Sequence, residues 1–524
     1  MTGEAAGIDL LMKCNVMTAV AVQLPQAVAA LIAQHAAGAA AATAVGPAKQ
    51  NFEDAASLVE QVTHLCWNLA EASPAAMALV DKGRLWMGLF ECLNPKVFPA
   101  RIVAVAVQCL QTFSDDNPVF AATVAGTPKL VEHLMALLQP GVDGQTSRVS
   151  ACVAGILMNS GVGTTEPAVT AAVLQSIGAL LAVDTAAAMA GVVPVLQSAA
   201  RANKLASGPD RAKLGSFKEL LGAQQTALEV LANFCYTGGD DVGWGSDDGD
   251  DGAEGGGGAA GGADVDAGGA AKFALIATHQ LPARVLARCT DISVGVRQMC
   301  AGNGEIGSNL LASYTSMQVR AISALGNVLA IVQPAGLAAG FVGTLWAGLY
   351  SLGSTSTASA NPIFGESVTS TMFALVRRAI ECPELAPQLV PTAAQLETLA
   401  KLAVSSADES TRVNLVGLMA GIGQLPSQAA ALPGIGTVLV HAITAEQSPW
   451  VLSEALNGIF DCFAEPETNE VVAKLGMIKH LQVLAPKIAA ALKSGTLDAH
   501  VAGRLEEASL NLGPFLEYKE PQFK

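Results

Sequence analysis

The sequence has few charged and few aromatic side chains. Charged residues are 14% of the 524 residues, against roughly 25% in an ordinary globular protein, and Phe, Trp and Tyr together make up 5%. Hydrophobic residues nevertheless reach 51%, with alanine prominent among them, and glycine occurs 52 times. Small side chains favour close helix contacts over bulky sheet cores. We therefore expect an all-α protein and no β-rich fold.

Positive charge is also scarce. Lys and Arg number 29 against 45 Asp and Glu, which gives a net charge of −16. This charge repels nucleic-acid phosphates and anionic lipid head groups. We therefore expect no direct nucleic-acid partner and no membrane-surface partner.

The signatures of disulfide frameworks, glycosylation and metal sites are absent from the sequence. The ten cysteines stand singly, without a Cys-x-x-Cys pair, and no Asn-x-Ser/Thr acceptor occurs. Both facts suit a reducing compartment with free, mostly buried thiols. The seven histidines never fall at ligand spacing with another His or Cys on one helix face, so we expect no zinc site.

Sequence motifs of catalysis are missing too. No G-x-S-x-G, Walker A or H-E-x-x-H pattern occurs, and we expect neither an enzyme nor a cofactor. Gly302, Gly304 and Gly307 spell G-x-G-x-x-G, but the preceding run 296–300 has the character of a helix end. A phosphate site of this type must follow a strand. The match is therefore interpreted as a chance one in a loop.

Three long stretches lack charge, namely residues 14–48, 321–365 and 413–445. Each is long enough to span a bilayer, so an alanine-rich multi-span membrane protein is one alternative. Gln and Pro interrupt all three stretches, which favours helices buried in a repeat protein. The start carries Glu4 and Asp9 where a secretory signal carries positive charge, and we expect no cleaved targeting peptide.

Apolar residues recur at helical spacing along most of the chain, and Pro-containing breaks separate them at short intervals. A weak repeat accompanies this pattern, because six helices carry an Asn followed by a small or apolar residue, at Asn68, Asn159, Asn233, Asn327, Asn457 and Asn511. Several of the gaps are close to multiples of the ≈ 40–47-residue armadillo/HEAT unit. The pattern predicts an α-solenoid, a superhelix of armadillo and HEAT repeats.

One segment departs from this pattern. Residues 238–269 hold 14 glycines and nine acids, and no Lys or Arg occurs between Lys218 and Lys272. Such a composition cannot bury enough apolar surface to fold, so we expect a disordered acidic loop over 237–271.

EF-hand order is not met there, and a solvated spacer is the alternative to a binding loop. Trp244 favours binding, as an apolar anchor among acids that attract a basic partner; the acids are Asp240, Asp241, Asp247, Asp248, Asp250, Asp251 and Glu254.

The asparagines near helix ends have two interpretations. An Asn near a helix C-terminus can cap the helix, and an Asn on the concave helix of an armadillo stack can bond the backbone of an extended peptide. Trp67 stands beside Asn68, and tryptophan in such a groove can hold a Lys or Arg stem. The candidate peptide groove therefore comprises Trp67, Asn68, Asn159 and Asn233.

Six runs, taken in order, resemble the symportins, HEAT/armadillo adaptors that bring ribosomal proteins of the 5S ribonucleoprotein into the nucleus. The runs are VTHLCWNLAE at 62–71, VAVQCLQTFSDDNP at 105–118, AQQTALEVLANFCY at 223–236, TRVNLVGLMAGIG at 411–423, EALNGIFDCFAE at 454–465 and EEASLNLGPFLEYK at 506–519. The third run leads directly into the acidic segment, as it does in the family. The resemblance covers nearly the whole chain.

The resemblance implies a function that composition does not give. It implies a chaperone for two basic 5S-rRNA-binding ribosomal proteins, shuttling between cytoplasm and nucleus. One client's extended terminal segment would lie near Trp67, Asn68 and Asn159, and the acidic loop with the following HEAT repeats would hold the RNA-binding face of the other. A karyopherin of the importin β class is a further implied partner. Family members begin with a further armadillo-like stretch and a basic tail that this receptor reads, whereas this sequence opens almost at the Trp67 helix, so direct receptor binding is not supported here.

These observations predict three parts: armadillo/HEAT-like repeats over 1–236, the acidic loop over 237–271 and HEAT-like repeats over 272–524. The expected function is a non-enzymatic import adaptor and chaperone for the 5S-associated ribosomal proteins. The alternatives are a generic repeat scaffold with another basic client and the multi-span membrane protein.

Overall fold

The protein is an all-α repeat solenoid in the computed structural model, which describes residues 2–38, 46–139, 143–202, 208–236, 262–334, 337, 340–355 and 361–523. Within these ranges the regular elements are α-helices and short 3-10 helices, and no strand is present. The fold class expected from the small, helix-favouring side chains is confirmed. The chain divides into two compact units, which are described separately.

Unit 1 contains residues 1–234, 278–288 and 292–320. Its helices are α1 (Thr2–Lys13), α2 (Val16–Ala36), α3 (Pro47–Ala72), α4 (Pro74–Gly83), α5 (Trp86–Glu91), α6 (Ala100–Ser114), α7 (Pro118–Ala125), α8 (Pro128–Ala136), α9 (Gly144–Asn159), α10 (Val162–Thr165), α11 (Pro167–Ala182), α12 (Thr185–Ala202), α13 (Gly208–Cys235), α15 (Leu281–Cys289), α16 (Val294–Ala301) and the first part of α17 (Gly304–Ile331).

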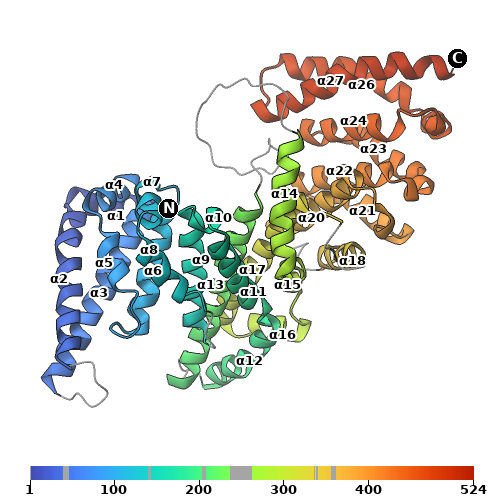
Figure 1. Ribbon diagram of the computed structural model, residues 1–524. Helices are drawn as coiled ribbons and strands as arrows, with labels where there is room; N and C mark the ends of the chain where they lie inside the picture. The colour runs from blue at the N-terminus through green and yellow to red at the C-terminus, as the bar shows by residue number, and fades with distance from the viewer. Residues whose placement is uncertain are drawn as a thin grey trace. The chain divides into compact units, whose positions relative to one another are not determined.

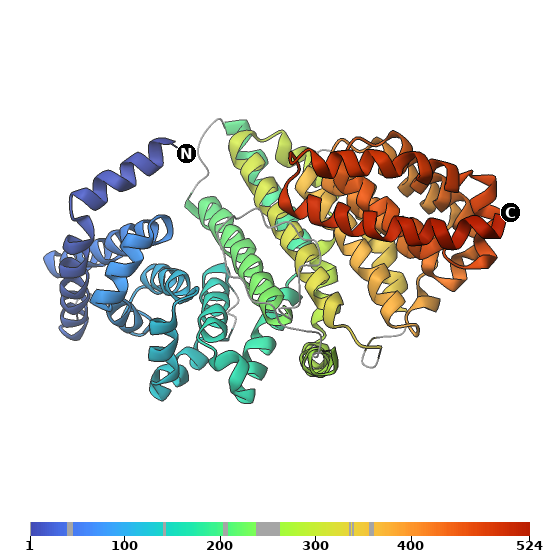
Figure 2. The same cartoon turned by 90° about the horizontal axis from the view of Figure 1, so that it is seen from above.

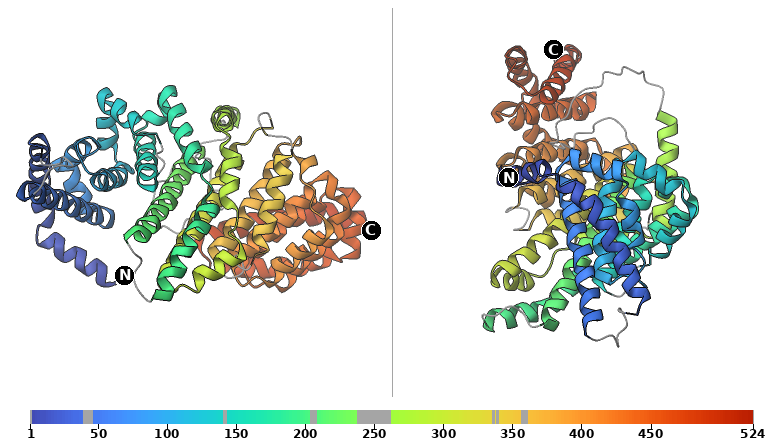
Figure 3. Two further views of the ribbon diagram at one scale, coloured as in Figure 1. Left: turned by 90° about the horizontal axis from the view of Figure 1, so that it is seen from below. Right: turned by 90° about the vertical axis from the view of Figure 1, so that its left-hand side faces the viewer.

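One set of helices in unit 1 packs in succession. α3 packs on α6 and α6 packs on α9 (Figure 1). Arg148 of α9 then donates to the Gly222 carbonyl and, at 2.9 Å, to Thr226 Oγ1, both on α13. Gln225 of α13 donates to the Ser313 carbonyl of α17 at 3.1 Å. Figure 3 shows this part of the chain in blue to green from two further sides. The helices that carry Asn68, Asn159 and Asn233 therefore belong to one continuous stack of helices.

Unit 2 contains residues 235–277, 289–291 and 321–524. Its α-helices are α14 (Gly262–Thr278), the end of α17, α18 (Phe341–Gly353), α20 (Pro362–Glu381), α21 (Ala393–Ser405), α22 (Glu409–Gln424), α23 (Leu432–Ala445), α24 (Pro449–Phe463), α25 (Asn469–Lys474), α26 (Met477–Lys493) and α27 (Ala499–Lys519). The 3-10 turns are η1 (Ala386–Gln388), η2 (Pro426–Ala431), η3 (Pro466–Thr468) and η4 (Glu520–Phe523).

The helices of unit 2 form two layers. α20, α22, α24 and α27 pack in that order in one layer, and α18, α21, α23 and α26 pack against them from the other side. Figure 2 shows the last pair, α26 and α27, side by side in red. Successive helix pairs stacked in this way are the architecture of HEAT-type repeats.

Proline positions explain where many helices begin. Pro74, Pro118 and Pro167 each occupy the first turn of a helix, where the missing N–H costs nothing. Asn117 caps α7, because its Oδ1 accepts the N–H of Phe120 at 3.0 Å. The breaks expected at these prolines are confirmed.

The three glycines of the G-x-G-x-x-G pattern form a helix–helix turn. Gly302 ends α16, Gly304 opens α17 with φ +62°, and a Cβ on Gly307 would lie 2.1 Å from the Cys300 carbonyl oxygen. The preceding element is a helix, as the sequence indicates. The glycines therefore allow the tight turn between α16 and α17. The strand that a dinucleotide site requires is not present before them.

Two helices among the described residues are long and apolar enough to cross a membrane, Val16–Ala36 and Pro426–Ala445, and a bent pair, Pro167–Ala182 with Thr185–Ser198, would make a third. α2 packs on α3, and α23 packs on α22, α24 and α26. Leu24 and Leu31 on α2 are fully buried in these contacts. These helices therefore have protein neighbours on one face.

The chain passes from unit 1 to unit 2 after Phe234, close to the predicted start of the acidic segment, and returns to unit 1 further on. α14 begins at Gly262, so residues 262–271, which the sequence suggested as loop, are helical. Residues 278–288 and 292–320 belong with unit 1. The three-part organisation by repeat type stays a prediction, and residues 237–261 lie outside the described ranges.

Candidate functional site

Trp67 lies at the junction between α3 and α6. Its indole Nε1 donates to Thr112 Oγ1 of α6 at 2.9 Å. His64, one turn earlier on α3, stacks on the indole with ring centroids 6.1 Å apart and planes 21° from parallel. The ring remains partly exposed. Because both its edge and one face are held by neighbours, the indole presents a fixed apolar surface to a ligand.

Asn159, the last residue of α9, connects that helix to the end of α6. Its Nδ2 donates to Ser114 Oγ at 3.0 Å and to Asp115 Oδ1 at 2.5 Å. The side chain therefore bonds the neighbouring helix, and Ser160 supplies the backbone N–H that caps α9. Asn159 thus does not cap its own helix. Its hydrogen bond instead holds the Asp115 carboxylate at the end of α6, the helix that also accepts the Trp67 indole N–H.

The carboxyl of Asp115 is electrostatically strained. Its pKa is raised from 3.8 to about 6, chiefly by partial loss of water; the Asn159 hydrogen bond acts in the opposite direction, and the charges of Asp116 and Glu229 add to the increase. Glu229 belongs to α13 and pairs with Arg320 of α17. A cation bound beside Asp115 would relieve the repulsion among these acids.

We call this set the unit 1 polar strip, and its residues are Trp67, Thr112, Asp115, Asn159 and Glu229, from α3, α6, α9 and α13. Of the residues predicted for a peptide groove, Trp67 and Asn159 both contact α6. Asn68 is exposed beside Trp67, and Asn233 is exposed one turn after Glu229. A polypeptide-binding role for these four residues stays a prediction.

Sequence reasoning missed Thr112, Asp115 and Glu229. Asp115 stands in the run 105–118 that carried a family resemblance, but only the helix packing shows that it faces Asn159. Glu229 lies in the run 223–236 and is separated from Asp115 by more than a hundred positions. A contact at that separation leaves no local sequence signal.

The acids of the predicted binding loop and Trp244 lie outside the described residues. In the parts of the chain that the structure does describe, no three His, Cys, Asp or Glu side chains gather as metal ligands. Burial, with the charge of Glu91, raises the pKa of the Cys92 thiol to about 12. A thiol in such surroundings is a poor nucleophile.

Comparison with known proteins gives relatives along most of the chain. Residues 272–522 match the family model described as SYO1-like, TPR repeats. The human HEAT repeat-containing protein 3 is 23% identical over 535 residues, covering 90% of this chain and 77% of that protein. Symportin 1 of Chaetomium thermophilum is 30% identical over 115 residues, or 21% of this chain and 17% of that protein.

The fold and these relatives define a class, the α-helical repeat solenoids that act as scaffolds. Within that class, the family model and the two relatives support a symportin-like relationship for the chain. Among solved structures, an engineered protein aligns over 87% of this chain and 96% of its own at 16% identity, with a TM-score of 0.39. A TM-score below 0.5 carries no argument about fold or function.

Proposed function

We propose that the chain is a non-enzymatic transport adaptor and dedicated chaperone. Its clients are the basic large-subunit ribosomal proteins that bind 5S rRNA, and its role is to promote their nuclear import and large-subunit biogenesis. It moves between cytoplasm and nucleus with them. A karyopherin of the importin β class is the receptor that this role implies.

The unit 1 polar strip is the observation that carries the proposal. It places a fixed indole, an amide and two carboxylates on successive helices of a symportin-like solenoid. Extended basic segments suit such a surface, because the indole can hold a Lys or Arg stem and the carboxylates attract its charge. The net charge of −16 supports the same class of client.

The acidic segment adds a second contact in this proposal. Its seven acids between Asp240 and Glu254, with Trp244 among them, would mask the RNA-binding face of a client. Binding of this kind is screened by salt. A generic scaffold with another basic client would have the same charge but no preference for the 5S-associated proteins.

The test is calorimetric titration of the full chain with each 5S-rRNA-binding ribosomal protein at low and high salt. We expect tight binding of at least one client. Changing Asp247, Asp248, Asp250 and Asp251 to Asn should weaken it by about tenfold or more at low salt, which is ~1.4 kcal/mol. The matched control changes four exposed acids elsewhere, Glu397, Glu470, Glu506 and Glu517, to Gln. Failure of both clients to bind a folded, helical chain would overturn the proposal.

The membrane-protein alternative has one observation in its favour, the apolar helices Val16–Ala36 and Pro426–Ala445. It is distinguished by expressing the chain and centrifuging the lysate at high speed without detergent. Recovery in the supernatant as a helical monodisperse species supports the adaptor. Recovery only in membranes, released by detergent, supports the alternative.

A further inference from the structure

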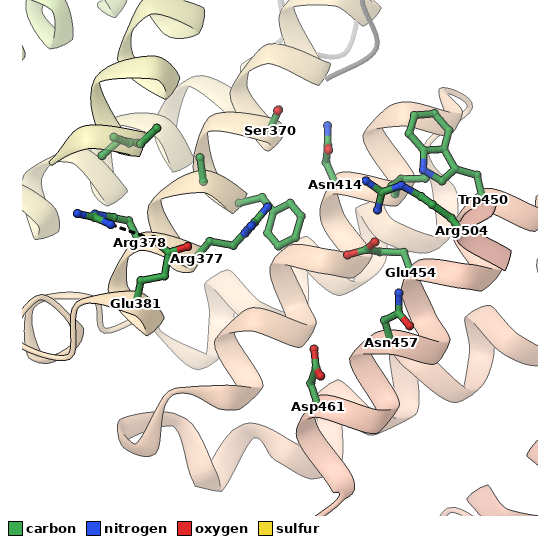
Figure 4. Close-up of a pocket in the computed structure, with 15 residues that line it drawn as sticks. Ser370, Arg377, Arg378, Glu381, Asn414, Trp450, Glu454, Asn457, Asp461 and Arg504 are labelled. Atoms are coloured by element: carbon green, nitrogen blue, oxygen red, sulfur yellow. Dashed lines mark hydrogen bonds and ion pairs between the residues drawn. The ribbon is translucent and has the colours of Figure 1, made fainter. Parts of the chain in front are cut away.

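A groove crosses the first layer of unit 2. Three adjoining cavities of about 400, 210 and 430 Å³ line up across α20, α22, α24 and α27. Asn457 and Asp461 of α24 line all three of them. Figure 4 shows the first cavity, with the labelled side chains of α20, α22, α24 and α27 around it. The succession of cavities makes the groove elongated, which suits an extended chain rather than a compact ligand.

α24 presents one face to this groove. Trp450, Glu454, Asn457 and Asp461 are spaced four, three and four residues apart, so they share one side of the helix. All four line the first cavity (Figure 4). An aromatic ring, a carboxylate, an amide and a second carboxylate thus follow one another along the groove.

Glu454 is the least satisfied of these groups. Among the described residues, its carboxylate has neither a hydrogen bond nor an ion pair within 4.0 Å. Burial raises its pKa, even though Arg504 and Arg377 act in the opposite direction. Burial likewise raises the pKa of Asp461. Asp461 is exposed and accepts a hydrogen bond from Gln424 Nε2 at 3.4 Å. Glu454 is therefore the carboxyl that has lost water without gaining a donor of its own, which is costly unless a ligand supplies one.

The glycine beneath Glu454 keeps the groove open. A Cβ on Gly417 of α22 would lie 2.5 Å from Glu454 Oε1 and 2.7 Å from Phe373 Cζ. Any larger residue at position 417 would push the carboxylate or the ring into the cavity. Gly417 thus leaves the space in which Glu454 lies.

The charges of the lining favour a cationic occupant. Arg378 and Glu381 pair with each other at 2.9 Å. Arg377 lies over the Phe373 ring, 6.0 Å from its centroid, and Arg504 donates to His500 Nε2 at 3.3 Å. The remaining acids, Glu454, Asp461 and Glu507, outnumber these two arginines. An anionic ligand would meet these carboxylates, whereas a basic one would satisfy them.

We propose that the groove formed by α20, α22, α24 and α27 is a second peptide site, which binds an extended basic segment. A Lys or Arg side chain stacks on Trp450 and pairs with Glu454 or Asp461, while the amides of Asn414 and Asn457 bond the backbone of the segment. None of its residues belongs to the unit 1 polar strip or to the acidic segment. It rests on the proposed function only in that the clients are basic proteins.

The experiment uses the full chain and a fluorescein-labelled octa-arginine peptide carrying a photo-crosslinker at one end. All variants carry Asn in place of Asp247, Asp248, Asp250 and Asp251, so that the acidic segment competes less. E454Q/D461N is compared with E397Q/E470Q, which removes the same charge from exposed positions of unit 2. W450A and the single variant D461N are measured as well. Asp461 is exposed, so D461N still tests the groove if the double variant folds poorly.

We expect E454Q/D461N to weaken octa-arginine binding at least tenfold relative to E397Q/E470Q, and cross-links on residues 450–461 and 504–511 to disappear. W450A should weaken binding severalfold, and octa-glutamate should not bind. Equal weakening by the groove and control variants would show non-specific attraction and overturn the proposal, as would binding of octa-glutamate through Arg377 and Arg504. The probe is not a ribosomal protein, so a failed titration with the 5S-associated clients leaves this result standing, and the reverse also holds.

Discussion

Asn159 Nδ2 donates to Asp115 Oδ1 at 2.5 Å and so joins the last residue of α9 to the end of α6. The bond fixes the carboxylate within the stack of helices that also carries Trp67. It joins two residues of the unit 1 polar strip that lie 44 positions apart in the sequence. The charge of the Asp115 carboxyl depends on pH near 6, because its pKa is raised to about 6.

Binding of a basic peptide to the unit 1 polar strip should strengthen as the pH rises through 6. Free Asp115 holds its proton below this pKa, and a bound cation favours the ionised form. Affinity should therefore change by up to about tenfold per pH unit below 6 and level off above it. Octa-arginine is the probe, because its charge does not titrate in this range, and fluorescence anisotropy from pH 5 to 8 is the measurement.

The variant D115N supplies the control for this pH dependence. Measurements are made with E454Q/D461N present, since the carboxyls of the unit 2 groove also titrate. D115N should flatten the difference between pH 5 and 7. An unchanged profile in D115N would assign the titration to another group and remove Asp115 from the binding surface.

Trp67 should contribute to client binding through its ring, and Thr112 through the orientation of that ring. We expect W67A to weaken binding of a 5S-associated ribosomal protein about 2- to 30-fold, the range of ~0.5–2 kcal/mol for a cation held on an indole. T112V keeps the ring and removes only the acceptor of the indole N–H, so its effect should be smaller. Calorimetry on both variants, with helicity by circular dichroism, checks the order. A larger loss in T112V than in W67A contradicts it.

The fold could be predicted from the sequence because its signals are local. Apolar spacing gives the helices, and prolines such as Pro118 mark where they begin. Gly302, Gly304 and Gly307 could be assigned to a turn because the preceding run is helical in pattern. By contrast, the start of α14 at Gly262 lies in a stretch of glycine and acid whose composition argues against a helix.

The candidate sites were less predictable because they join distant helices. Trp67 and Asn159 could be selected from the Asn repeat in the sequence. Asp115 could not, because its role depends on its contacts with Asn159 and Glu229. Asn457 stood in the Asn series, yet nothing local indicated that Glu454 would lie against Gly417. Contacts between successive repeats are set by packing, which a single sequence does not record.

The turn between α16 and α17 should tolerate no side chain at Gly307. A Cβ there meets the Cys300 carbonyl oxygen at 2.1 Å, and the obstacle is backbone. G307A should lower the free energy of unfolding by about 1–3 kcal/mol, as forced overpacking does. G295A is the matched control on α16, since no atom lies within 4 Å of its new Cβ. Urea denaturation should show little change for G295A, and equal losses in both variants would contradict the steric reason.

The ion pair between Arg412 and Glu446 should stabilise unit 2 at neutral pH and lose that effect in acid. Arg412 Nε lies 2.9 Å from Glu446 Oε2, and the two side chains are only 16% and 17% exposed. Burial by itself pushes the pKa of Glu446 upward, but the N–H groups of Ser448 and Gln447 and the Arg412 guanidinium together hold it below its ordinary 4.5. The folded state therefore binds this proton less tightly than the unfolded state does.

A lowered carboxyl pKa contributes stability that is fully present above pH 4.5 and is lost as the pH falls through the folded value. E446Q should therefore cost about 1–3 kcal/mol at pH 7, because it leaves a half-buried guanidinium without its charge partner. At pH 3 the variant and the parent should differ far less. E397Q removes a carboxylate that is 68% exposed, from a pair with Lys401, and should change little at either pH. Urea titrations at the two pH values check this, and an E446Q loss that persists unchanged at pH 3 would assign the effect to packing instead of charge.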